Sequence, residues 1–405
     1  MIVVGGGPAG LACALELRRR GIDVTVLERE QQAGGIPRHC EHQGFGIRDL
    51  RRLQSGPRYA QHYLELVREA GAAVLEETMV TGWTGDGALE VTSPSGRETL
   101  EADAIVLATG CRERPRPARL VPGSRPDGVL TTGLLQQLVQ GGLPVGRRAL
   151  VVGAEHVSFS AVLTLRHART GVVGMTTELD RHQSFSLVRA GAALRYRVPL
   201  WTRTAVAAIH GGRRVEEVEL TDLDRGVTRR VACDTVVFTG DWIPDQELAA
   251  GLGLDLDPGT RGPRVDTGLR TSRPGVFAAG NLLHGAEPAD VAALSGRRAA
   301  SSVASWLSGG NWPKQLVPAA IRVPLHWISP NAVSDRYDVP PREHFLLRSS
   351  AFLTHPRLEI RQGERVLWNG NLRRLVPGRS ASLPAGWITE VDAAGGRLTV
   401  TCVAN

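Results

Sequence analysis

The sequence predicts an α/β fold in which two parallel-sheet domains are interleaved and a small β-rich region follows. Three observations lead to this prediction. The first 28 residues run through an apolar strand, a glycine-rich turn, an amphipathic helix and a second strand, the order of a βαβ unit. Residues 234–240 repeat the apolar pattern of residues 104–110, which ends in Thr-Gly. From residue 311 onward, prolines and short alternating segments replace these patterns.

The first turn carries the glycine spacing of a dinucleotide-binding loop. Gly5 permits a tight turn, Gly7 lets a pyrophosphate approach the backbone, and Gly10 lets helix and strand pack closely. The helix N-terminus adds a partial positive charge. Glu28 ends the second strand, 18 residues after Gly10, where it can accept from an adenosine ribose hydroxyl. The sequence therefore predicts a bound dinucleotide here, with a purely structural turn as the alternative.

Further elements follow in order along the chain. A loop rich in Gly, His and Arg covers residues 31–58, a helix is expected over 59–70, and strands near 73–77 and 88–93. Residues 104–110 are apolar throughout, which is typical of a strand buried on both faces of a parallel sheet. Strands at 148–153 and 234–240 indicate an internal duplication, and a strand at 275–281 precedes a helix over 289–307. The predicted domains are 1–112 with 246–310, an inserted domain at 113–245, and an appendage at 311–405.

Composition limits the possible partners. The 405-residue chain has a formal net charge of +7, with 47 arginines and a single lysine, Lys314. The arginines alternate with acids, as over residues 213–219, which is typical of a solvated mixed surface rather than a nucleic-acid interface. No apolar run reaches the roughly 18 residues that span a membrane, and the first strand begins at Ile2, which leaves no room for a signal peptide. We expect a cytoplasmic protein with no nucleic-acid partner and no membrane span.

The five cysteines show no metal or disulfide pattern. They lack any Cys-x-x-Cys or Cys-x-x-His spacing, which argues against a zinc site, an iron–sulfur cluster and a secreted disulfide framework. They are Cys13, Cys40, Cys111, Cys233 and Cys402. We expect no metal and no iron–sulfur cluster in this chain.

Over residues 1–307 these motifs together resemble the two-dinucleotide-domain flavoproteins of the pyridine nucleotide–disulfide oxidoreductase superfamily. The resemblance implies that FAD binds in the first domain and that the helix over 289–307 directs its N-terminus at the flavin. Asn281 stands where the superfamily usually has Asp, and can still donate and accept. The implied FAD-binding residues are Gly5, Gly7, Pro8, Ala9, Gly10, Glu28, Arg29, Gly35, Ile36, Thr109, Gly110, Gly280, Asn281 and Ala289.

Within the superfamily the chain is most similar to the FAD α-type subunits of hydrogen cyanide synthase, opine dehydrogenases and D-hydroxyproline dehydrogenase. Residues 34–39, 131–136 and 280–297 carry this likeness. It implies an FAD-dependent oxidoreductase subunit of a heteromeric amino- or imino-acid dehydrogenase (opine, hydroxyproline or glycine type) in amino-acid catabolism. The implied partners are a small [2Fe–2S] protein and a second FAD-dependent, D-amino-acid-oxidase-like subunit. Flavoproteins of this type commonly carry a four-cysteine module, whereas residues 311–405 hold Cys402 alone.

Two departures from the superfamily concern its usual chemistry. In the second glycine loop, Glu155 puts a carboxylate where a glycine should admit a pyrophosphate, and Ser158 replaces the packing glycine. NAD(P) binding there is therefore doubtful. Disulfide reductases need a pair of cysteines near the flavin, but residues 35–46 hold Cys40 alone. Dithiol chemistry is not expected.

The candidate catalytic residues are His39, Cys40 and His42, which follow the first βαβ unit directly. Histidine titrates near neutral pH and could move the proton that accompanies flavin reduction. A metal site would need a third and a fourth ligand, and polar residues that satisfy a glycine-rich loop are the simpler alternative. In the C-terminal region, Trp368 and Trp387 are of the type that anchors subunit interfaces, with a lid or cap as the other interpretation.

Three other functions remain open from the sequence. The chain could be a stand-alone NAD(P)H-dependent FAD reductase or a flavoprotein associated with anaerobic glycerol-3-phosphate dehydrogenase. It could also be a non-catalytic scaffold with FAD as a structural ligand.

Overall fold

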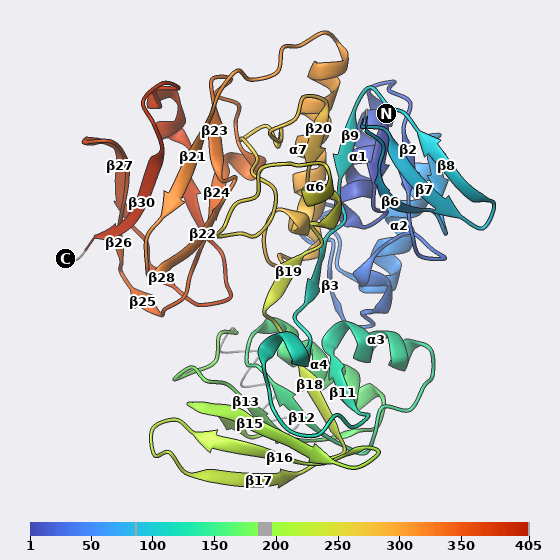
Figure 1. The fold of residues 1–405 in the computed structure, drawn as a ribbon, viewed down its shortest axis with the longest axis vertical. Coiled ribbons are helices and arrows are strands. Elements are labelled where there is room, and N and C mark those ends of the chain that lie inside the picture. Colours follow the sequence, from blue (N-terminus) through green and yellow to red (C-terminus); the bar gives the residue numbers. More distant parts are fainter. Residues whose placement is uncertain (86, 185–196, 404–405) are drawn as a thin grey trace. The chain divides into compact units, whose positions relative to one another are not determined.

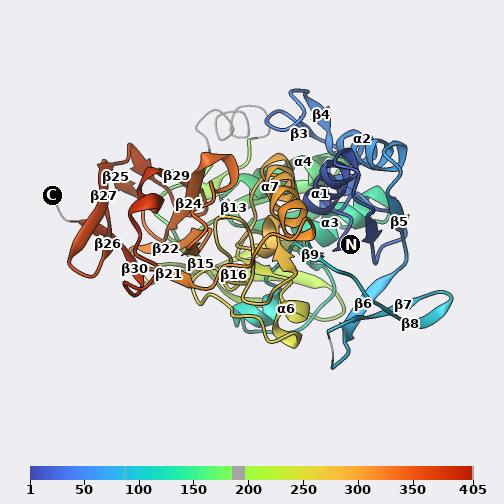
Figure 2. The same ribbon diagram turned by 90° about the horizontal axis from the view of Figure 1, so that it is seen from above.

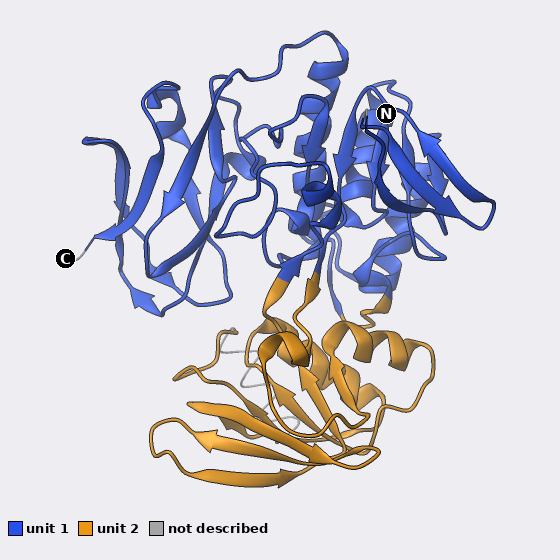
Figure 3. Ribbon diagram, in the orientation of Figure 1, with its two compact units in different colours: residues 1–38, 43–111, 243–405 blue, residues 39–42, 112–242 orange. Residues whose placement is uncertain are grey.

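The computed structural model describes residues 1–85, 87–184 and 197–403, and the chain forms two compact units (Figure 3). Unit 1 comprises residues 1–38, 43–111 and 243–405, and unit 2 comprises residues 39–42 and 112–242. Each unit contains a five-stranded parallel sheet. The predicted α/β fold with two sheet domains is therefore confirmed, while the predicted domain boundaries stay an interpretation.

The parallel sheet of unit 1 has the strand order β20-β9-β1-β2-β5. Its strands are short and mostly buried, as the apolar runs predict: β20 (Val276–Ala278), β9 (Ile105–Leu107), β1 (Ile2–Val4), β2 (Thr25–Leu27) and β5 (Ala73–Leu75). Helices α1 (Pro8–Arg19) and α7 (Ala289–Leu307) pack side by side (Figures 1 and 2). They come close because Gly296 has no Cβ, which would collide with the Ala9 carbonyl oxygen. Helix α2 (Gly56–Glu69) packs on α1.

Smaller elements surround this sheet. Helix α6 spans Glu247–Gly251, and the short 3₁₀ helices η1 and η3 span Ile36–His39 and Gly280–Leu282. The hairpin strands are β3 (Gln43–Phe45) and β4 (Gln54–Ser55), and a three-stranded antiparallel sheet contains β6 (Met79–Trp83), β7 (Leu89–Ser93) and β8 (Gly96–Leu100).

The C-terminal part of unit 1 is β-rich, as predicted, and has its own buried core. A five-stranded sheet contains β23 (Ala332–Ser334), β21 (Leu316–Ile321), β30 (Leu398–Val403), β26 (Arg357–Gln362) and β27 (Arg365–Asn371), in that order. A three-stranded sheet contains β22 (Leu325–Ser329), β24 (His344–Ser349) and β29 (Ala381–Pro384), and a pair contains β25 (Leu353–Thr354) and β28 (Arg374–Leu375). Two 3₁₀ helices, η4 (Pro341–Glu343) and η5 (Gly386–Glu390), lie in the connections.

The two tryptophans singled out in this region have different environments. Trp387 is 2% exposed and stacks on Phe345 with ring centroids 4.9 Å apart. The prediction that Trp387 anchors a subunit interface is therefore wrong, because its ring is already used in the domain core. Trp368 is partly exposed on β27, an edge strand of the five-stranded sheet.

Unit 2 repeats the plan of unit 1. Its parallel sheet has the order β11-β18-β12-β13-β14, with strands β11 (Val129–Thr131), β18 (Thr235–Phe238), β12 (Arg148–Val152), β13 (Gly171–Thr176) and β14 (Leu200–Trp201). Helices α3 (Thr132–Gln140) and α4 (His156–His167) pack beside it. An antiparallel sheet contains β15 (Thr204–Gly211), β16 (Val215–Asp222) and β17 (Thr228–Ala232). In each unit the strand that enters the glycine loop lies at the centre of the sheet, which agrees with an internal duplication.

The chain passes between the units at residues 38–43, at β10 (Cys111–Glu113) and at β19 (Trp242–Pro244), and the 3₁₀ helix η2 spans Arg116–Arg119. Within the described residues no helix combines the length and apolar character that a bilayer crossing requires.

Candidate functional site

The glycine loop of unit 1 connects β1 to α1 and is open on one side. A Cβ added at Gly5 would lie 2.5 Å from the Ala108 carbonyl oxygen, and one at Gly10 would collide with the Gly5 carbonyl oxygen. These two glycines are required by packing within the chain. A Cβ at Gly7 would meet no atom within 4 Å. Packing in the chain itself therefore does not explain Gly7, whereas a pyrophosphate at the helix N-terminus would.

Glu28 lies directly beside this loop. Its side chain is 6% exposed, and its two oxygens accept from the backbone N–H groups of Gly6 at 2.8 Å and Glu30 at 2.9 Å. These two hydrogen bonds hold the carboxylate in one orientation and leave lone pairs on its oxygens that can accept further hydrogen bonds. This arrangement fits a hydrogen bond to a ribose hydroxyl. Its neighbour Arg29 is more exposed and lies 3.7 Å from the Glu30 carboxylate.

The residues after β2 and β20 lie against the same loop. A Cβ at Gly35 would lie 3.0 Å from the Gly7 Cα, and one at Gly280 would lie 2.6 Å from the Ala9 Cβ. Both glycines have positive φ, +64° and +73°, which L side chains rarely adopt. Ile36 is 54% exposed although it is apolar. The backbone at Gly35 and Gly280 thus packs directly against the glycine loop, and the role of these residues in FAD binding stays a prediction.

Asn281 has a structural task that the sequence did not reveal. Its side-chain amide donates to the Glu287 carbonyl oxygen at 3.1 Å and accepts from the Glu287 N–H at 3.0 Å. An aspartate could accept but not donate here, so the amide explains the replacement of Asp by Asn. The pair closes the loop that leads to Ala289 at the start of α7.

Thr109 and Gly110 fix the chain at Asp245. The Thr109 hydroxyl donates to the Asp245 carbonyl oxygen at 2.8 Å, and the Gly110 carbonyl oxygen accepts from the Asp245 N–H at 3.0 Å. Both residues therefore hold the end of the crossover strand β9 in place within unit 1.

A buried polar network fixes the first turn of α7, and sequence reasoning missed it. Asp290 is 2% exposed, and its two carboxylate oxygens accept from the Arg48 guanidinium at 3.0 and 3.1 Å. Asp49, which follows Arg48 in the chain, accepts hydrogen bonds from the hydroxyls of Tyr59 at 2.6 Å and Tyr63 at 2.8 Å. Burial, together with the Asp49 charge, raises the pKa of both tyrosines. The i, i+4 spacing of the two tyrosines on α2 is visible in the sequence, but it fits apolar packing equally well.

The candidate catalytic segment, residues 39–42, belongs to unit 2 and is bound by its helices. His39 Nδ1 pairs with Gln140 Oε1, and the Cys40 thiol donates to Gln136 Oε1 at 3.4 Å. His42 Nε2 pairs with Ser160 Oγ at 2.8 Å. Because the proposed FAD residues belong to unit 1, a catalytic role for the two histidines stays a prediction.

Cys40 is not poised for thiol chemistry. It is 7% exposed, and burial raises the pKa of its thiol to about 12. The nucleophilic form of cysteine is the thiolate, which is scarce at neutral pH when the pKa is this high. The geometry therefore argues against Cys40 as a redox thiol. Among the described residues, no group of three or more His, Cys, Asp or Glu side chains is arranged to hold a metal ion.

The second glycine loop, between β12 and α4, is filled by the chain itself. Glu155 is the N-cap of α4, and its carboxylate accepts from the Ala154 N–H at 2.9 Å and the Thr239 hydroxyl at 2.6 Å. The Ser158 hydroxyl accepts from the Glu155 N–H and pairs with the Thr239 hydroxyl at 2.7 Å. A Cβ at Gly240 would collide with Glu155 Oε1. The Glu155 carboxylate thus lies at the N-terminal end of α4, between the glycine loop and Thr239.

A second carboxylate of unit 2, missed in the sequence, lies at the start of α3. Glu113 is 7% exposed and accepts from the Gly133 N–H at 2.8 Å, while its Oε1 has no partner among the described residues. Burial raises the pKa of Glu113 to about 7, against the lowering effect of the hydrogen bond from the Gly133 N–H. In the described part of unit 2, a carboxylate therefore accepts from the first turn of α3, and another caps α4.

Comparison with known proteins agrees with this fold. The family model described as "Pyridine nucleotide-disulphide oxidoreductase" matches residues 1–296. Hydrogen cyanide synthase subunit HcnB of Pseudomonas aeruginosa is 26% identical over 333 residues, which cover 75% of this chain and 70% of that protein. An opine oxidase subunit of Agrobacterium tumefaciens is 29% identical over 336 residues, which cover 74% of this chain and 64% of that protein. The crystal structure of Lactococcus lactis thioredoxin reductase matches with a TM-score of 0.62 at 18% identity, over 76% of this chain and 98% of that one.

Proposed function

We propose, from the premise that the chain belongs to the pyridine nucleotide-disulphide oxidoreductase family, that it is the flavoprotein subunit of a heteromeric amino- or imino-acid dehydrogenase. Family membership makes the protein an FAD-dependent oxidoreductase. The observation that carries the finer proposal is the contrast between its two glycine loops. The loop of unit 1 is open at Gly7, and the loop of unit 2 is filled by Glu155.

FAD fits the residues of unit 1. The open side of Gly7 and the N-terminus of α1 would receive the pyrophosphate, and Glu28 would accept from the ribose. Asn281 would shape the FAD site indirectly, because it closes the loop of residues 281–287. The pairing of Arg48 with Asp290 would hold the start of α7 in place. When bound, FAD supplies reversible two-electron transfer. The chain contributes its binding, its orientation and the charges around it.

Two routes for electrons are disfavoured on this chain. The Glu155 carboxylate at the start of α4 would repel the phosphates of NAD(P)H and would take up the room that they need. A dithiol route would need a thiolate with a partner cysteine, but Cys40 is buried with a raised pKa and stands alone in its segment. Electrons would therefore be exchanged with another polypeptide.

The partner proposal has separate support. The two curated relatives described above are each named as a subunit. The proposed partners are a small [2Fe–2S] protein, since residues 311–405 contain only Cys402, and a second FAD-dependent, D-amino-acid-oxidase-like subunit. The edge strand β27, with Trp368 partly exposed, is the proposed docking element for that second flavoprotein.

The test is reconstitution. The chain would be co-expressed with the products of its neighbouring genes, purified by a tag on this chain, and assayed under anaerobic conditions with glycine, hydroxyproline and opines. We expect co-purified subunits and flavin bleaching by one of these substrates only in the complex. Trp368→Arg should reduce co-purification, whereas Met79→Arg, at an exposed apolar residue of β6, should not. A chain that purifies alone and is bleached rapidly by NADPH would contradict the proposal and favour a stand-alone reductase.

A further inference from the structure

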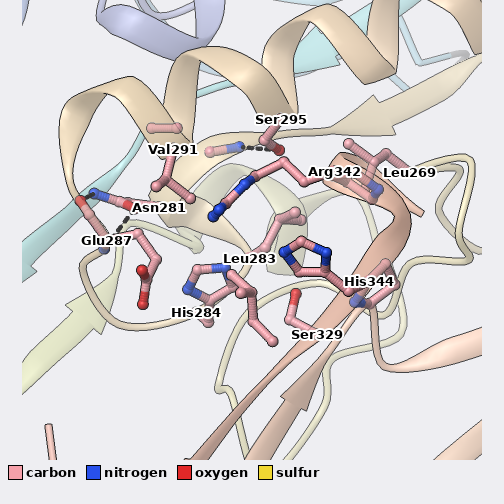
Figure 4. Close-up of a pocket in the computed structure, with 15 residues that line it drawn as sticks. Leu269, Asn281, Leu283, His284, Glu287, Val291, Ser295, Ser329, Arg342 and His344 are labelled. Carbon is pink, nitrogen blue, oxygen red and sulfur yellow. Dashed lines mark hydrogen bonds between the residues drawn. The ribbon is translucent and has the colours of Figure 1, made fainter. Parts of the chain in front are cut away.

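Unit 1 contains a cavity between the start of α7 and the C-terminal β region (Figure 4). Its volume is about 30 Å³, room for roughly two water molecules and comparable to the head group of a small acid. Apolar side chains such as Leu283 form part of the wall. The polar groups that converge on it come from His284, Ser329, Arg342 and His344. A small, partly apolar space with a few convergent polar groups is typical of a ligand site.

Two of these groups have no hydrogen-bond or ion-pair partner among the described residues. His344 Nε2 is buried and makes no hydrogen bond to any described residue. Buried polar atoms of native proteins nearly always have a partner, so such an atom at a cavity indicates a missing one. Arg342 forms no ion pair or side-chain hydrogen bond with the part of the chain that the structure describes. Its guanidinium extends across the cavity in Figure 4.

The backbone holds Arg342 in an unusual conformation. Arg342 and Glu343 have φ values of +60° and +64°, and the 3₁₀ helix η4 is broken there. Two successive non-glycine residues in the left-handed region are costly, and such conformations gather at ligand clamps. Here the turn directs the Arg342 side chain to the cavity, while the Glu343 side chain is not part of the lining.

The charge balance of the cavity is positive. Glu287 also lines it, but its carboxylate accepts from the Arg348 guanidinium at 2.9 Å and from the Ser380 hydroxyl. Both partners of the Glu287–Arg348 pair have side chains 10% exposed. With Glu287 neutralised, Arg342 is the uncompensated charge among the described residues that line the cavity.

His284 forms a fixed wall of the cavity. Its ring stacks on Trp327 with centroids 4.7 Å apart, and its Nδ1 bonds the Gly285 carbonyl oxygen at 2.9 Å. Because both contacts fix the ring, His284 shapes the space and leaves Arg342 and His344 to meet a ligand.

We propose that this cavity binds the carboxylate of a small organic acid, held by the Arg342 guanidinium and by His344 Nε2 and the Ser329 hydroxyl. The planar guanidinium fork matches a carboxylate, and a His N–H and a hydroxyl complete its hydrogen bonds. The size of the cavity selects a short acid whose remaining atoms face the open side. Gly280 and Asn281, which are among the proposed FAD residues, also line the cavity, but the three groups proposed to hold the carboxylate are not among them.

Calorimetric titration of the purified full-length protein tests this site without any redox turnover. The probes are sodium acetate, pyruvate and glycine, with sodium phosphate and sodium chloride at matched ionic strength as comparison. We expect saturable one-site binding of at least one carboxylate. Arg342→Met should weaken that binding about ten- to hundredfold, the usual loss for hydrogen bonds to a charged group. His344→Phe should weaken it severalfold.

Arg322→Met is the matched control, because Arg322 is also exposed in the C-terminal part of unit 1 but does not line the cavity. It should leave the affinity unchanged. Circular dichroism would establish that the Arg342 and His344 variants are folded, and Arg342→Lys, which keeps the charge but loses the fork, should give an intermediate affinity. The proposal is overturned if no carboxylate binds saturably, if binding is insensitive to Arg342→Met and His344→Phe, or if phosphate binds more tightly than every carboxylate.

Discussion

The two glycine loops of this chain occupy equivalent places in their sheets but differ in what lies at the helix N-terminus. At α1 a Cβ on Gly7 would meet open space, and at α4 the Glu155 carboxylate accepts from the Ala154 N–H and the Thr239 hydroxyl. A helix N-terminus attracts an anion. In unit 1 the anion would come from a cofactor, and in unit 2 the chain supplies it. The two copies of the fold therefore keep the same strand order and differ in the group that lies at the helix N-terminus.

The largest effect is expected from a substitution that fills the open loop of unit 1. Gly7→Val should yield a colourless protein, because two methyl groups would enter the space proposed for the pyrophosphate. FAD content would be measured by absorbance after purification. Gly386→Val is the control, since a Cβ at Gly386 also meets no atom within 4 Å but lies in the C-terminal region. A yellow Gly7→Val protein with normal FAD occupancy would remove the basis of the site.

The next largest effect concerns residues 39–42, which form hydrogen bonds with α3 and α4 of unit 2. If His39 or His42 moves the flavin proton, replacement by Ala should slow reduction by roughly 10²- to 10⁴-fold with FAD still bound. Cys40→Ser should change the rate little, because the thiol is buried with a pKa raised to about 12. Rates would be measured in the assembled complex. Full activity of both histidine variants would mean that residues 39–42 have only a structural role, in their contacts with α3 and α4.

A third change sharpens the comparison by opening the filled loop. Glu155→Gly removes the carboxylate and should allow NADH to bind at least about tenfold more tightly than to the parent chain, a difference of about 1.4 kcal/mol measured by fluorescence titration. Because glycine is itself accepted at an N-cap, the loss of the Glu155 cap should cost only about a few tenths of a kcal/mol of stability. Glu155→Gln is the matched control, because it removes the charge and keeps the bulk. If neither variant binds NADH more tightly than the parent, the carboxylate is not what closes the loop.

A smaller effect is expected from the second carboxylate of unit 2. The pKa of Glu113 is raised from 4.5 to about 7, chiefly by burial. The folded state therefore binds this proton more tightly than the unfolded chain does. The contribution of Glu113 to the free energy of unfolding is fully present below about pH 4.5 and is lost as the pH rises through about 7. Glu113→Gln should flatten that decline and stabilise the protein at pH 8 by on the order of 1–3 kcal/mol. Urea unfolding between pH 5 and pH 8 would measure this pH dependence of the free energy of unfolding. Glu178→Gln is the control, because Glu178 is exposed.

The sequence is informative where the signal is local. The βαβ unit, the apolar strands and α7, predicted over 289–307 and observed as Ala289–Leu307, follow from periodicity and glycine spacing. The sequence also makes NAD(P) binding at the second loop doubtful through the charge of Glu155, and this stays a prediction. The hydrogen-bond partner of Glu155, Thr239, lies 84 residues away, and no local pattern connects the two. For the same reason the sequence does not reveal the pairing of Asp49 with Tyr59 and Tyr63.

Other differences arise from which face of an element is buried. The sequence suggests an interface role for Trp387, but no local pattern shows that the 3₁₀ helix η5 turns this ring into the domain core, where it packs on Phe345. Gln136 belongs to a motif visible in the sequence, yet its bond to Cys40 depends on the arrangement of α3 with a segment 96 residues away. The antiparallel sheet of β15, β16 and β17 escapes prediction, because its residues alternate only partly in burial.

The central claim, one open and one filled nucleotide loop, is tested most directly by mixing the FAD-bound chain with NADH or NADPH in an anaerobic stopped-flow instrument. The account predicts that dithionite bleaches the flavin completely while neither nicotinamide cofactor does so on the timescale of turnover. Reduction by NADH or NADPH at roughly tens per second, an ordinary enzymatic rate, would contradict it.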